Sequence, residues 1–283
     1  MKYIEVKIFA GKEGIDPLIT AVMMLGISDL VIEDQAEIEP NITVYLQDCD
    51  EGKDTLGRIK SEFAQLCVEC RVVDDETWNS GQREFFKPSK VTERIVVKPS
   101  WEEYKAKENE LIIELGPGMA FGTGMHPTTT MCMKFMEQYS GQYKSALDIG
   151  CGSGILSITA AALGAKDVLG IDIDGSAVDI ACDNVLLNRY GGKIRIIKGD
   201  LIKGVDFKAD LVVANLMAEL VMLLAEDLPK NLVPGGIFIS SGILLEKREE
   251  VRASVKKSGF EIIDMTEEGE WCAISARLRK NGI

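Results

Sequence analysis

Three glycines at alternate positions follow a short apolar run near the middle of the chain. Residues 147–156 read LDIGCGSGIL, so Gly150, Gly152 and Gly154 separate a predicted strand from a predicted helix. Glycine has no side chain, and a backbone built from it can approach a ligand closely where a parallel strand ends. The segment is consistent with a tight strand-to-helix turn alone, or with a turn that also holds part of a ligand.

A carboxylate follows at the spacing that would complete such a site. Asp172 comes 22 residues after Gly150, at the end of the next predicted strand. An acid about 20 residues beyond a glycine turn can accept hydrogen bonds from the hydroxyls of a ribose. The alternative is that Asp172 only caps the following helix. Taken together, the glycines and Asp172 favour a nucleoside ligand over a purely structural turn.

The form of the turn separates two nucleoside ligands. Dinucleotide sites favour the pattern G-x-G-x-x-G, whereas here the third glycine comes one residue sooner. An acid, Asp148, also lies two residues before the first glycine. This form favours S-adenosylmethionine over a nicotinamide dinucleotide.

Asn215 is a candidate for the chemistry itself. It follows the apolar predicted strand 210–214, and we expect it on the same sheet edge as Gly150 and Asp172. Its position is similar to that of the Asn or Asp that opens the N-P-P-Y motif of amino-group methyltransferases, although Leu216 follows here. An amide oxygen at this place could accept a hydrogen bond from an attacking amine. The alternative is that Asn215 caps the next helix.

The order of predicted elements indicates two folded parts. From residue 145 onwards, strands and helices alternate, which predicts an α/β fold with a doubly wound, mainly parallel sheet. These elements are expected at 145–149, 155–163, 168–171, 176–188, 193–198 and 210–214. The first part reads β-α-β-β-α-β, which is typical of a small ferredoxin-like α+β domain. We therefore predict a domain at 1–75, a connector at 76–100 and a second domain at 101–283.

Elements of the first part follow from periodicity and turn signals. Ile4, Val6 and Ile8 share one face of a strand, and further strands are expected at 30–34, 41–48 and 68–73. Helices are expected from Asp16 to Leu25 and over the apolar positions between 56 and 66.

Composition excludes several classes of function. The chain has 283 residues, 46% of them hydrophobic, and no apolar run near the roughly 20 residues that span a bilayer. Charges interrupt the first apolar residues, so we expect no export signal and a cytoplasmic protein. Seven cysteines, most of them in apolar segments as at Cys132, Cys182 and Cys272, indicate reduced, buried thiols. The single histidine, His126, makes a metal site improbable.

Charge is also uneven along the chain. The net charge is −13, and residues 1–90 hold 10 Lys and Arg against 18 Asp and Glu, a balance of −8. A negative field repels phosphate backbones and anionic lipid, and it attracts basic partners. We therefore expect no direct binding of nucleic acid or membrane.

Several motifs together carry a family resemblance over nearly the whole chain. Residues 117–129 read PGMAFGTGMHPTT, and the glycine turn and Asp172 are followed by VANL at 213–216, SGIL at 241–244 and EWC at 270–272. In these motifs the sequence resembles the bacterial methyltransferases that modify large-subunit ribosomal protein eleven. It departs from the family pattern at Gly116, where Asp is usual, and at Gln82 and Arg83, where Trp and Lys are usual.

The resemblance implies a class I methyltransferase sheet behind a small recognition domain, with S-adenosyl-L-methionine as the cofactor. It places cofactor contacts at Thr129, Gly150, Asp172 and Asn215, and Gly152 lies in the same turn. The implied reaction is transfer of methyl groups to lysine side chains and the α-amine of the basic ribosomal protein. Thr129 could instead cap the helix that we expect it to begin.

Asn215 is the residue we expect to be catalytic, because methyl transfer to nitrogen is an in-line displacement that needs alignment and exclusion of water.

Three alternatives stay open. The chain could methylate another protein or a small-molecule amine, it could bind the cofactor without catalysis, or it could be an oxidoreductase. No residue stands out as a general base. Trp271 is expected in the core, and Asp200 could be an ordinary turn residue.

Overall fold

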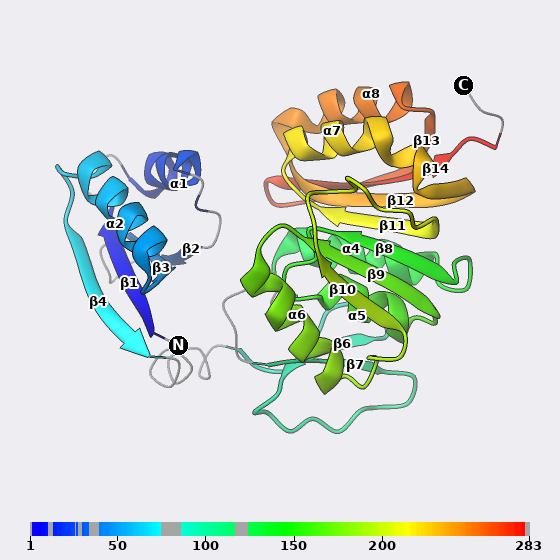
Figure 1. Cartoon of the computed structure of the whole chain (residues 1–283), viewed down its shortest axis with the longest axis horizontal. Coiled ribbons are helices and arrows are strands. Elements are labelled where there is room, and N and C mark those ends of the chain that lie inside the picture. The colour runs from blue at the N-terminus through cyan, green and yellow to red at the C-terminus, as the bar shows by residue number, and fades with distance from the viewer. Residues whose placement is uncertain are drawn as a thin grey trace. The chain divides into compact units, whose positions relative to one another are not determined.

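The chain forms two compact units, Met1–Phe86 and Lys87–Ile283. The computed structural model describes residues 2–10, 14–25, 27, 30–33, 40–74, 86–116 and 124–280 (Figure 1). Within the described residues, no helix has the length and apolar character needed to cross a bilayer.

The first unit has a four-stranded antiparallel sheet and two helices. Its elements in chain order are β1 (Lys2–Phe9), α1 (Ile15–Met24), β2 (Leu30–Glu33), β3 (Asn41–Gln47), α2 (Asp50–Glu62) and β4 (Val68–Asp74). The strand order β2-β3-β1-β4 is that of the predicted ferredoxin-like fold. The helix predicted over 56–66 begins earlier, at Asp50, and ends at Glu62, with Phe63 as its C-cap.

The core of this unit forms because one face of β1 and one face of β3 are apolar. Val6, Ile8, Ile42 and Val44 are fully buried, and Ile59 of α2 packs into the same cluster. Strands β1 and β3 pair so that Val6 lies opposite Val44 and Ile8 opposite Ile42. The alternation of apolar and polar residues in β1 therefore predicted its buried face correctly.

A small three-stranded sheet begins the second unit. It consists of β5 (Ser89–Lys90), β6 (Ile95–Pro99) and β7 (Leu111–Leu115), in the order β5-β6-β7, with β6 and β7 parallel. Strands β5 and β6 lie in the segment predicted as a connector, and neither strand was predicted. Residues 75–85 of that segment lie outside the described residues.

A seven-stranded sheet forms the centre of the second unit. Its strands are β8 (Ser145–Ile149), β9 (Asp167–Asp172), β10 (Ile194–Lys198), β11 (Ala209–Asn215), β12 (Leu232–Leu244), β13 (Phe260–Glu268) and β14 (Trp271–Leu278). The order is β10-β9-β8-β11-β12-β14-β13, and β14 runs antiparallel to both of its neighbours. The remaining pairs are parallel, which confirms the predicted doubly wound α/β sheet.

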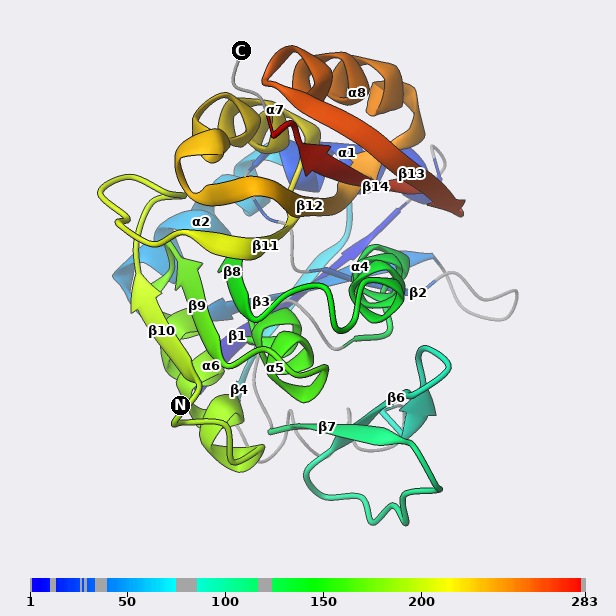
Figure 2. The same ribbon diagram turned by 90° about the vertical axis from the view of Figure 1, so that its right-hand side faces the viewer.

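Helices cover both faces of this sheet, as Figure 2 shows. The α-helices are α4 (Pro127–Gln138), α5 (Ile155–Ala162), α6 (Gly175–Leu187), α7 (Ala218–Asp227) and α8 (Arg248–Lys257), with short 3-10 turns at η2 (Leu228–Lys230) and η3 (Leu245–Lys247). Helices α4, α5 and α6 lie on one face, and α7 packs against α8 on the other. Buried side chains such as Leu147, Ile149, Phe238 and Phe260 fill the layer under α7 and α8.

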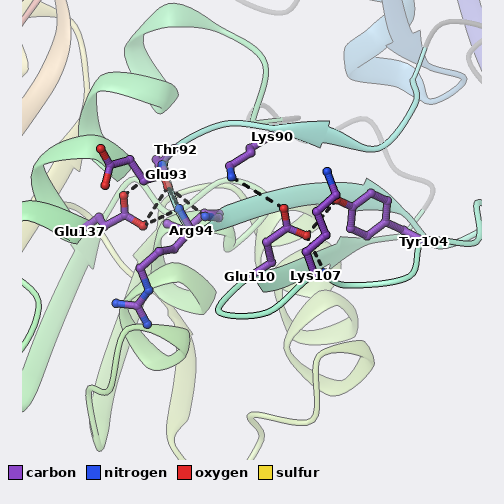
Figure 3. Close-up of polar contacts among 9 residues, drawn as sticks. Lys90, Thr92, Glu93, Arg94, Tyr104, Lys107, Glu110 and Glu137 are labelled. Carbon is purple, nitrogen blue, oxygen red and sulfur yellow. Dashed lines mark hydrogen bonds and ion pairs between the residues drawn. The ribbon is translucent and has the colours of Figure 1, made fainter.

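A carboxylate of α4 holds the turn between β5 and β6. Glu137 Oε1 accepts hydrogen bonds from the Thr92 hydroxyl and the Arg94 backbone N–H, each at 3.0 Å, and Oε2 accepts one from the Glu93 N–H at 3.2 Å (Figure 3). Because α4 also carries Thr128 and Thr129, this contact connects the small sheet to the helix of the candidate site.

The loop between β6 and β7 has its own carboxylate. Glu110 Oε2 accepts hydrogen bonds from the Tyr104 hydroxyl and the Lys107 backbone N–H, each at 2.9 Å (Figure 3). The hydrogen bond from the Lys107 N–H is the main reason that the pKa of Glu110 lies below its usual value. Lys90 of β5 forms an ion pair with the same carboxylate at 3.7 Å.

Asn184 of α6 and Asn188, the C-cap residue of α6, bind the edge of β7 that does not pair with β6. Asn188 Oδ1 accepts a hydrogen bond from the Glu114 N–H at 2.8 Å, and its Nδ2 donates to the Glu114 carbonyl at 2.6 Å. Asn184 Oδ1 accepts from the Gly116 N–H at 2.8 Å, and its Nδ2 donates to the Ser153 carbonyl in the glycine turn at 2.9 Å. Asn184 therefore links the end of β7 to that turn.

All seven cysteines are free. Burial was predicted correctly for Cys132 and Cys272, whereas Cys182 is half-buried. Cys49, Cys67 and Cys70 of the first unit are exposed, so the prediction of buried thiols is wrong for them. Cys70 lies in β4, Cys49 is the N-cap residue of α2 and Cys67 directly precedes β4, all in a small unit where few residues are available to cover them.

Candidate active site

The glycine turn lies directly after β8 and adopts a backbone conformation that favours glycine. The φ angles of Gly150, Gly152 and Gly154 are 68°, 52° and 78°. These positive values are costly for residues with a Cβ atom. A Cβ on Gly150 would also lie 2.6 Å from Leu216 Cδ2. Glycine at these positions therefore avoids the strain that a Cβ atom would add to the turn.

The Asp172 carboxylate lies beside this turn, at the end of β9. Its Oδ2 accepts a hydrogen bond from the Gly152 N–H at 2.8 Å, and its Oδ1 accepts one from the Asp174 N–H at 3.0 Å. The N-cap position of α6 belongs to Asp174, whose side chain accepts from the Ser176 N–H. Asp172 is thus not the helix cap, and the structural alternative for this residue is wrong.

Asp148 is a buried carboxyl group beneath the same turn. It is 1% exposed, and its Oδ2 accepts a hydrogen bond from the Ser157 hydroxyl at 2.7 Å. Among the described residues, no hydrogen-bond partner lies within reach of its Oδ1. Burial raises the pKa of Asp148 to about 7, although the bond from Ser157 opposes this change.

Asn215 ends β11 on the same edge of the sheet. Its Nδ2 donates to the Thr128 hydroxyl oxygen at 3.1 Å and to the Thr129 hydroxyl oxygen at 3.3 Å. A Cβ on Gly242 would lie 3.0 Å from Asn215 Oδ1 and 2.5 Å from the Leu216 carbonyl oxygen. Because Gly242 has no side chain, there is room for the amide oxygen of Asn215 next to its backbone.

Neither Asn215 nor Thr129 caps a helix. The N-cap position of α7 belongs to Met217, and that of α4 belongs to His126. Helix α4 begins at Pro127, two residues before the start we expected at Thr129. Proline at the first helical position is a start signal that predicts this earlier boundary. Asn215, Thr128 and Thr129 instead form one polar cluster through the hydrogen bonds of Asn215 Nδ2.

These residues together form a site at the carboxyl edge of a doubly wound sheet, where such folds bind their ligands. A family model described as "Ribosomal protein L11 methyltransferase (PrmA)" matches residues 2–279. The chain belongs to this family. It is an enzyme, a methyltransferase that uses S-adenosylmethionine, as the form of the glycine turn predicted.

Relatives and solved structures agree with this assignment. The methyltransferase is 37% identical over 311 residues to a ribosomal protein L11 methyltransferase of Alkaliphilus oremlandii, with 99% of both chains covered. It is 49% identical over 212 residues to one of Clostridium botulinum strain Eklund 17B, covering 75% of this chain and 67% of the relative. A crystal structure of ribosomal protein L11 methylase from Lactobacillus delbrueckii subsp. bulgaricus superposes with a TM-score of 0.65 and 32% identity, covering 69% of this chain and all of the other.

The geometry of Asp172 fits the ribose of the cofactor. Each carboxylate oxygen of Asp172 accepts one backbone hydrogen bond, and an ionised carboxylate has about four acceptor positions. Two positions thus remain for two hydroxyl donors. Ile173, the next residue, is 66% exposed and offers an apolar surface beside them.

Two other predicted cofactor residues, Gly152 and Thr129, have hydrogen-bond partners within the chain. The Gly152 N–H is donated to Asp172, so Gly152 orients the carboxylate. Thr129 is 1% exposed, and its hydroxyl oxygen accepts a hydrogen bond from Asn215 Nδ2, so it lies on the NH₂ side of the Asn215 amide. Direct contact of Gly152 or Thr129 with the cofactor stays a prediction.

Two further residues that the sequence singled out, Trp271 and Asp200, have clear positions. Trp271 is half-buried at the start of β14, and its ring meets the edge of the His126 imidazole at 5.4 Å between centroids. Asp200 is exposed and accepts a hydrogen bond from Lys203. Phe121 lies outside the described residues. The residue that the sequence prediction missed is Thr128, which comes one position before a residue that was singled out.

Proposed function

We propose that this methyltransferase transfers methyl groups from S-adenosylmethionine to amino groups of ribosomal protein L11, on lysine side chains and on the α-amine. The observation that carries the proposal is the orientation of Asn215. Its Nδ2 is taken by the hydroxyls of Thr128 and Thr129 at the sheet edge that also holds Asp172. The amide oxygen is thus the end of the side chain that can accept a hydrogen bond from an amine.

Within this proposal, each group of the chain has a limited task. The cofactor supplies an electrophilic methyl group. Asp172 holds the ribose, and the glycine turn allows the backbone to approach closely. Asn215 Oδ1 accepts an N–H of the acceptor and so directs the nitrogen lone pair, which is the alignment that an in-line displacement requires.

The acceptor amine must be neutral when it attacks. A lysine side chain has a reference pKa of about 10.4, so the site must favour loss of a proton. Removal from water disfavours the charged form of an amine. Met125 and Met217 flank the polar cluster in sequence and are 51% and 55% exposed, so they offer apolar surface against which an aliphatic lysine stem can pack. We propose that such packing contributes the desolvation.

The first unit is proposed to recognise the substrate. Its acidic balance favours encounter with a basic ribosomal protein and disfavours binding to free nucleic acid. Residues 1–75, or the unit Met1–Phe86, would then supply orientation, and Lys87–Ile283 would supply cofactor and chemistry. We further propose that the enzyme acts in the cytoplasm, where ribosomal proteins and reduced thiols occur together.

Methyl transfer from labelled S-adenosylmethionine into a mixture of ribosomal proteins tests the substrate. We expect label in one band, identified as L11 by mass spectrometry, on lysine and the α-amine. Label in another protein, or only in small amines, would refute the proposed substrate while leaving the methyltransferase activity intact. An Asn215→Ala variant serves as the control, because it should bind the cofactor and label little.

A further inference from the structure

His126 contacts the polar cluster through Thr128. The imidazole Nδ1 of His126 lies 2.8 Å from Thr128 Oγ1. The same Nδ1 accepts a hydrogen bond from the Thr128 backbone N–H at 3.4 Å, as the N-cap group of α4. Thr128 Oγ1 in turn lies 3.1 Å from Asn215 Nδ2. Three side chains therefore form a continuous chain of hydrogen bonds from His126 to Asn215.

The direction of this chain follows from the chemistry of each group. A ring nitrogen that accepts an N–H carries no proton of its own. The Thr128 hydroxyl, with one hydrogen and two lone pairs, must therefore be the donor in its contact with Nδ1. Because its hydrogen is used there, Thr128 Oγ1 can only accept from Asn215. The NH₂ end of the Asn215 amide must then face Thr128, and the oxygen must face the other way.

A hydroxyl without such a partner would not select one end of the amide. It can donate to an amide oxygen as well as accept from an amide nitrogen, and both arrangements have similar geometry. Thr128 is 1% exposed, so bulk water does not reach its hydroxyl to accept a hydrogen bond. The imidazole is the group that decides the direction.

The surroundings of His126 keep its ring neutral and in place. Burial lowers the pKa of His126 below its usual value. The ring meets Trp271 in an edge arrangement, with 68° between the planes. The neutral imidazole then carries its proton on Nε2.

We propose that His126 is a positioning residue that fixes, through the Thr128 hydroxyl, which end of the Asn215 amide faces the acceptor amine. This inference rests on the proposed role of Asn215 in holding the acceptor. Without the imidazole, the Thr128 hydroxyl donates to Asn215 Oδ1 in part of the population. In those molecules an NH₂ group meets the amine and cannot accept its hydrogen.

A double-mutant cycle tests the inference in the full-length enzyme. His126→Ala removes the acceptor, and Thr128→Val removes the hydroxyl with little change of shape. We expect each variant to lower the single-turnover rate at saturating cofactor by about three- to tenfold, the range of one hydrogen-bond preference. The double variant should be no slower than Thr128→Val alone, because His126 acts through that hydroxyl.

The cycle also separates positioning from helix capping. Thr128→Val keeps the backbone N–H that His126 caps, so His126→Ala should lower the melting temperature equally with Thr or Val at 128. Rates that fall by a further factor in the double variant, as the melting temperature does, would overturn the inference. Affinity for S-adenosylmethionine, measured by calorimetry, should change less than twofold in all three variants. His126→Asn keeps an acceptor atom and should restore most of the rate.

A spectroscopic measurement reads the inference without activity. His126 is the one histidine of the sequence, so ¹⁵N-histidine labelling gives a single imidazole in the NMR spectrum. We expect the neutral form with the proton on Nε2, and a shift of the Nδ1 signal in Thr128→Val. A proton on Nδ1 would overturn the inference even if the variants failed to fold.

Failure of the inference and failure of the proposed function give different results. If Asn215→Ala keeps the wild-type rate, the proposed role of Asn215 fails. If Asn215→Ala is slow while His126→Ala and Thr128→Val are as fast as wild type, only the positioning role of His126 fails.

Discussion

Gly152 donates its backbone N–H to Asp172 Oδ2 at 2.8 Å, and this bond joins the turn after β8 to the end of β9. The carboxylate is thereby held before any ligand binds, which lowers the entropic cost of binding.

Loss of the Asp172 carboxylate should therefore weaken the cofactor. Asp172→Ala leaves two ribose hydroxyls without acceptors, and we expect a loss of about 1.5–3 kcal/mol in binding free energy. Calorimetric titration measures it. Asp174→Ala is the matched control, because Asp174 is two residues away and only caps α6. Equal affinity of the folded Asp172→Ala variant and the wild type would remove Asp172 from the site.

Asn215→Ala should lower turnover far more than cofactor affinity. A small misplacement of reacting atoms can cost on the order of a hundredfold in rate. Single-turnover methyl transfer at saturating cofactor measures this effect, beside a denaturation curve. Asn215→Asp keeps an acceptor oxygen and should retain more activity than Ala. A near-normal rate in Asn215→Ala would contradict the catalytic role.

Gly150→Ala should disturb the glycine turn in two ways, through backbone strain and through a steric contact. The φ of Gly164 is 111°, and among the described residues nothing lies within 4 Å of a Cβ built there. Gly164→Ala should lower the free energy of unfolding by about 1–2 kcal/mol and leave cofactor affinity unchanged. Gly150→Ala adds the contact with Leu216 at 2.6 Å and should also weaken the cofactor. Equal stability and equal cofactor affinity of the two variants would show that the Leu216 side chain moves aside at no measurable cost.

Asp148 should make stability depend on pH. The folded protein holds the proton of Asp148 until about pH 7, whereas an unfolded chain releases it near pH 4. The contribution of this group to the free energy of unfolding is thus fully present below about pH 4 and falls as the pH rises to about 7. The fall is at most on the order of 4 kcal/mol, since one pH unit of separation corresponds to about 1.4 kcal/mol.

Asp148→Asn removes this titration. The free energy of unfolding of Asp148→Asn minus that of the wild type should increase between pH 4 and 7, and it should stay constant above pH 7. Urea denaturation at a series of pH values gives that difference. A constant difference across the series would show that Asp148 ionises as an ordinary aspartate.

Encounter with the substrate should depend on salt and on acids of the first unit. Raising ionic strength screens exposed charges and should slow association with a basic ribosomal protein. Glu62→Gln with Glu69→Gln, both exposed in the first unit, should reduce the association rate and its dependence on salt. Glu103→Gln with Glu108→Gln, exposed in the second unit, is the charge-matched control. Equal association rates for the two pairs would favour a role of the acidic surface in solubility.

Local patterns predicted the parts of the site that depend on neighbouring residues. The strand before Gly150 and the spacing to Asp172 lie within one strand-turn-helix-strand unit, β8-α5-β9, so they can be recognised along a short stretch of sequence. The contact of Asn215 with Thr128 joins residues 87 positions apart. No periodicity encodes such a contact, because it depends on which helix crosses the end of β11.

Short elements were the hardest to predict. Strand β5 has two residues, and all five residues of β6 are buried, so no alternation of buried and exposed residues stands out between Pro88 and Pro99. Their stability comes from β7 and from Glu137 of α4, both distant in sequence. The start of α4 did carry a signal, Pro127 after His126, which our expectation of a start at Thr129 overlooked.

Asn184 of α6 and its C-cap residue Asn188 also bear on whether another strand can add to β7. Strand β7 is the last strand of its sheet, and an open last strand offers unpaired N–H and C=O groups to any chain that can add a strand. Asn184 and Asn188 occupy these groups at Glu114 and Gly116, as a neighbouring strand would. Side-chain amides thus take the place of a neighbouring strand at Glu114 and Gly116, and they close this part of the edge to strand addition.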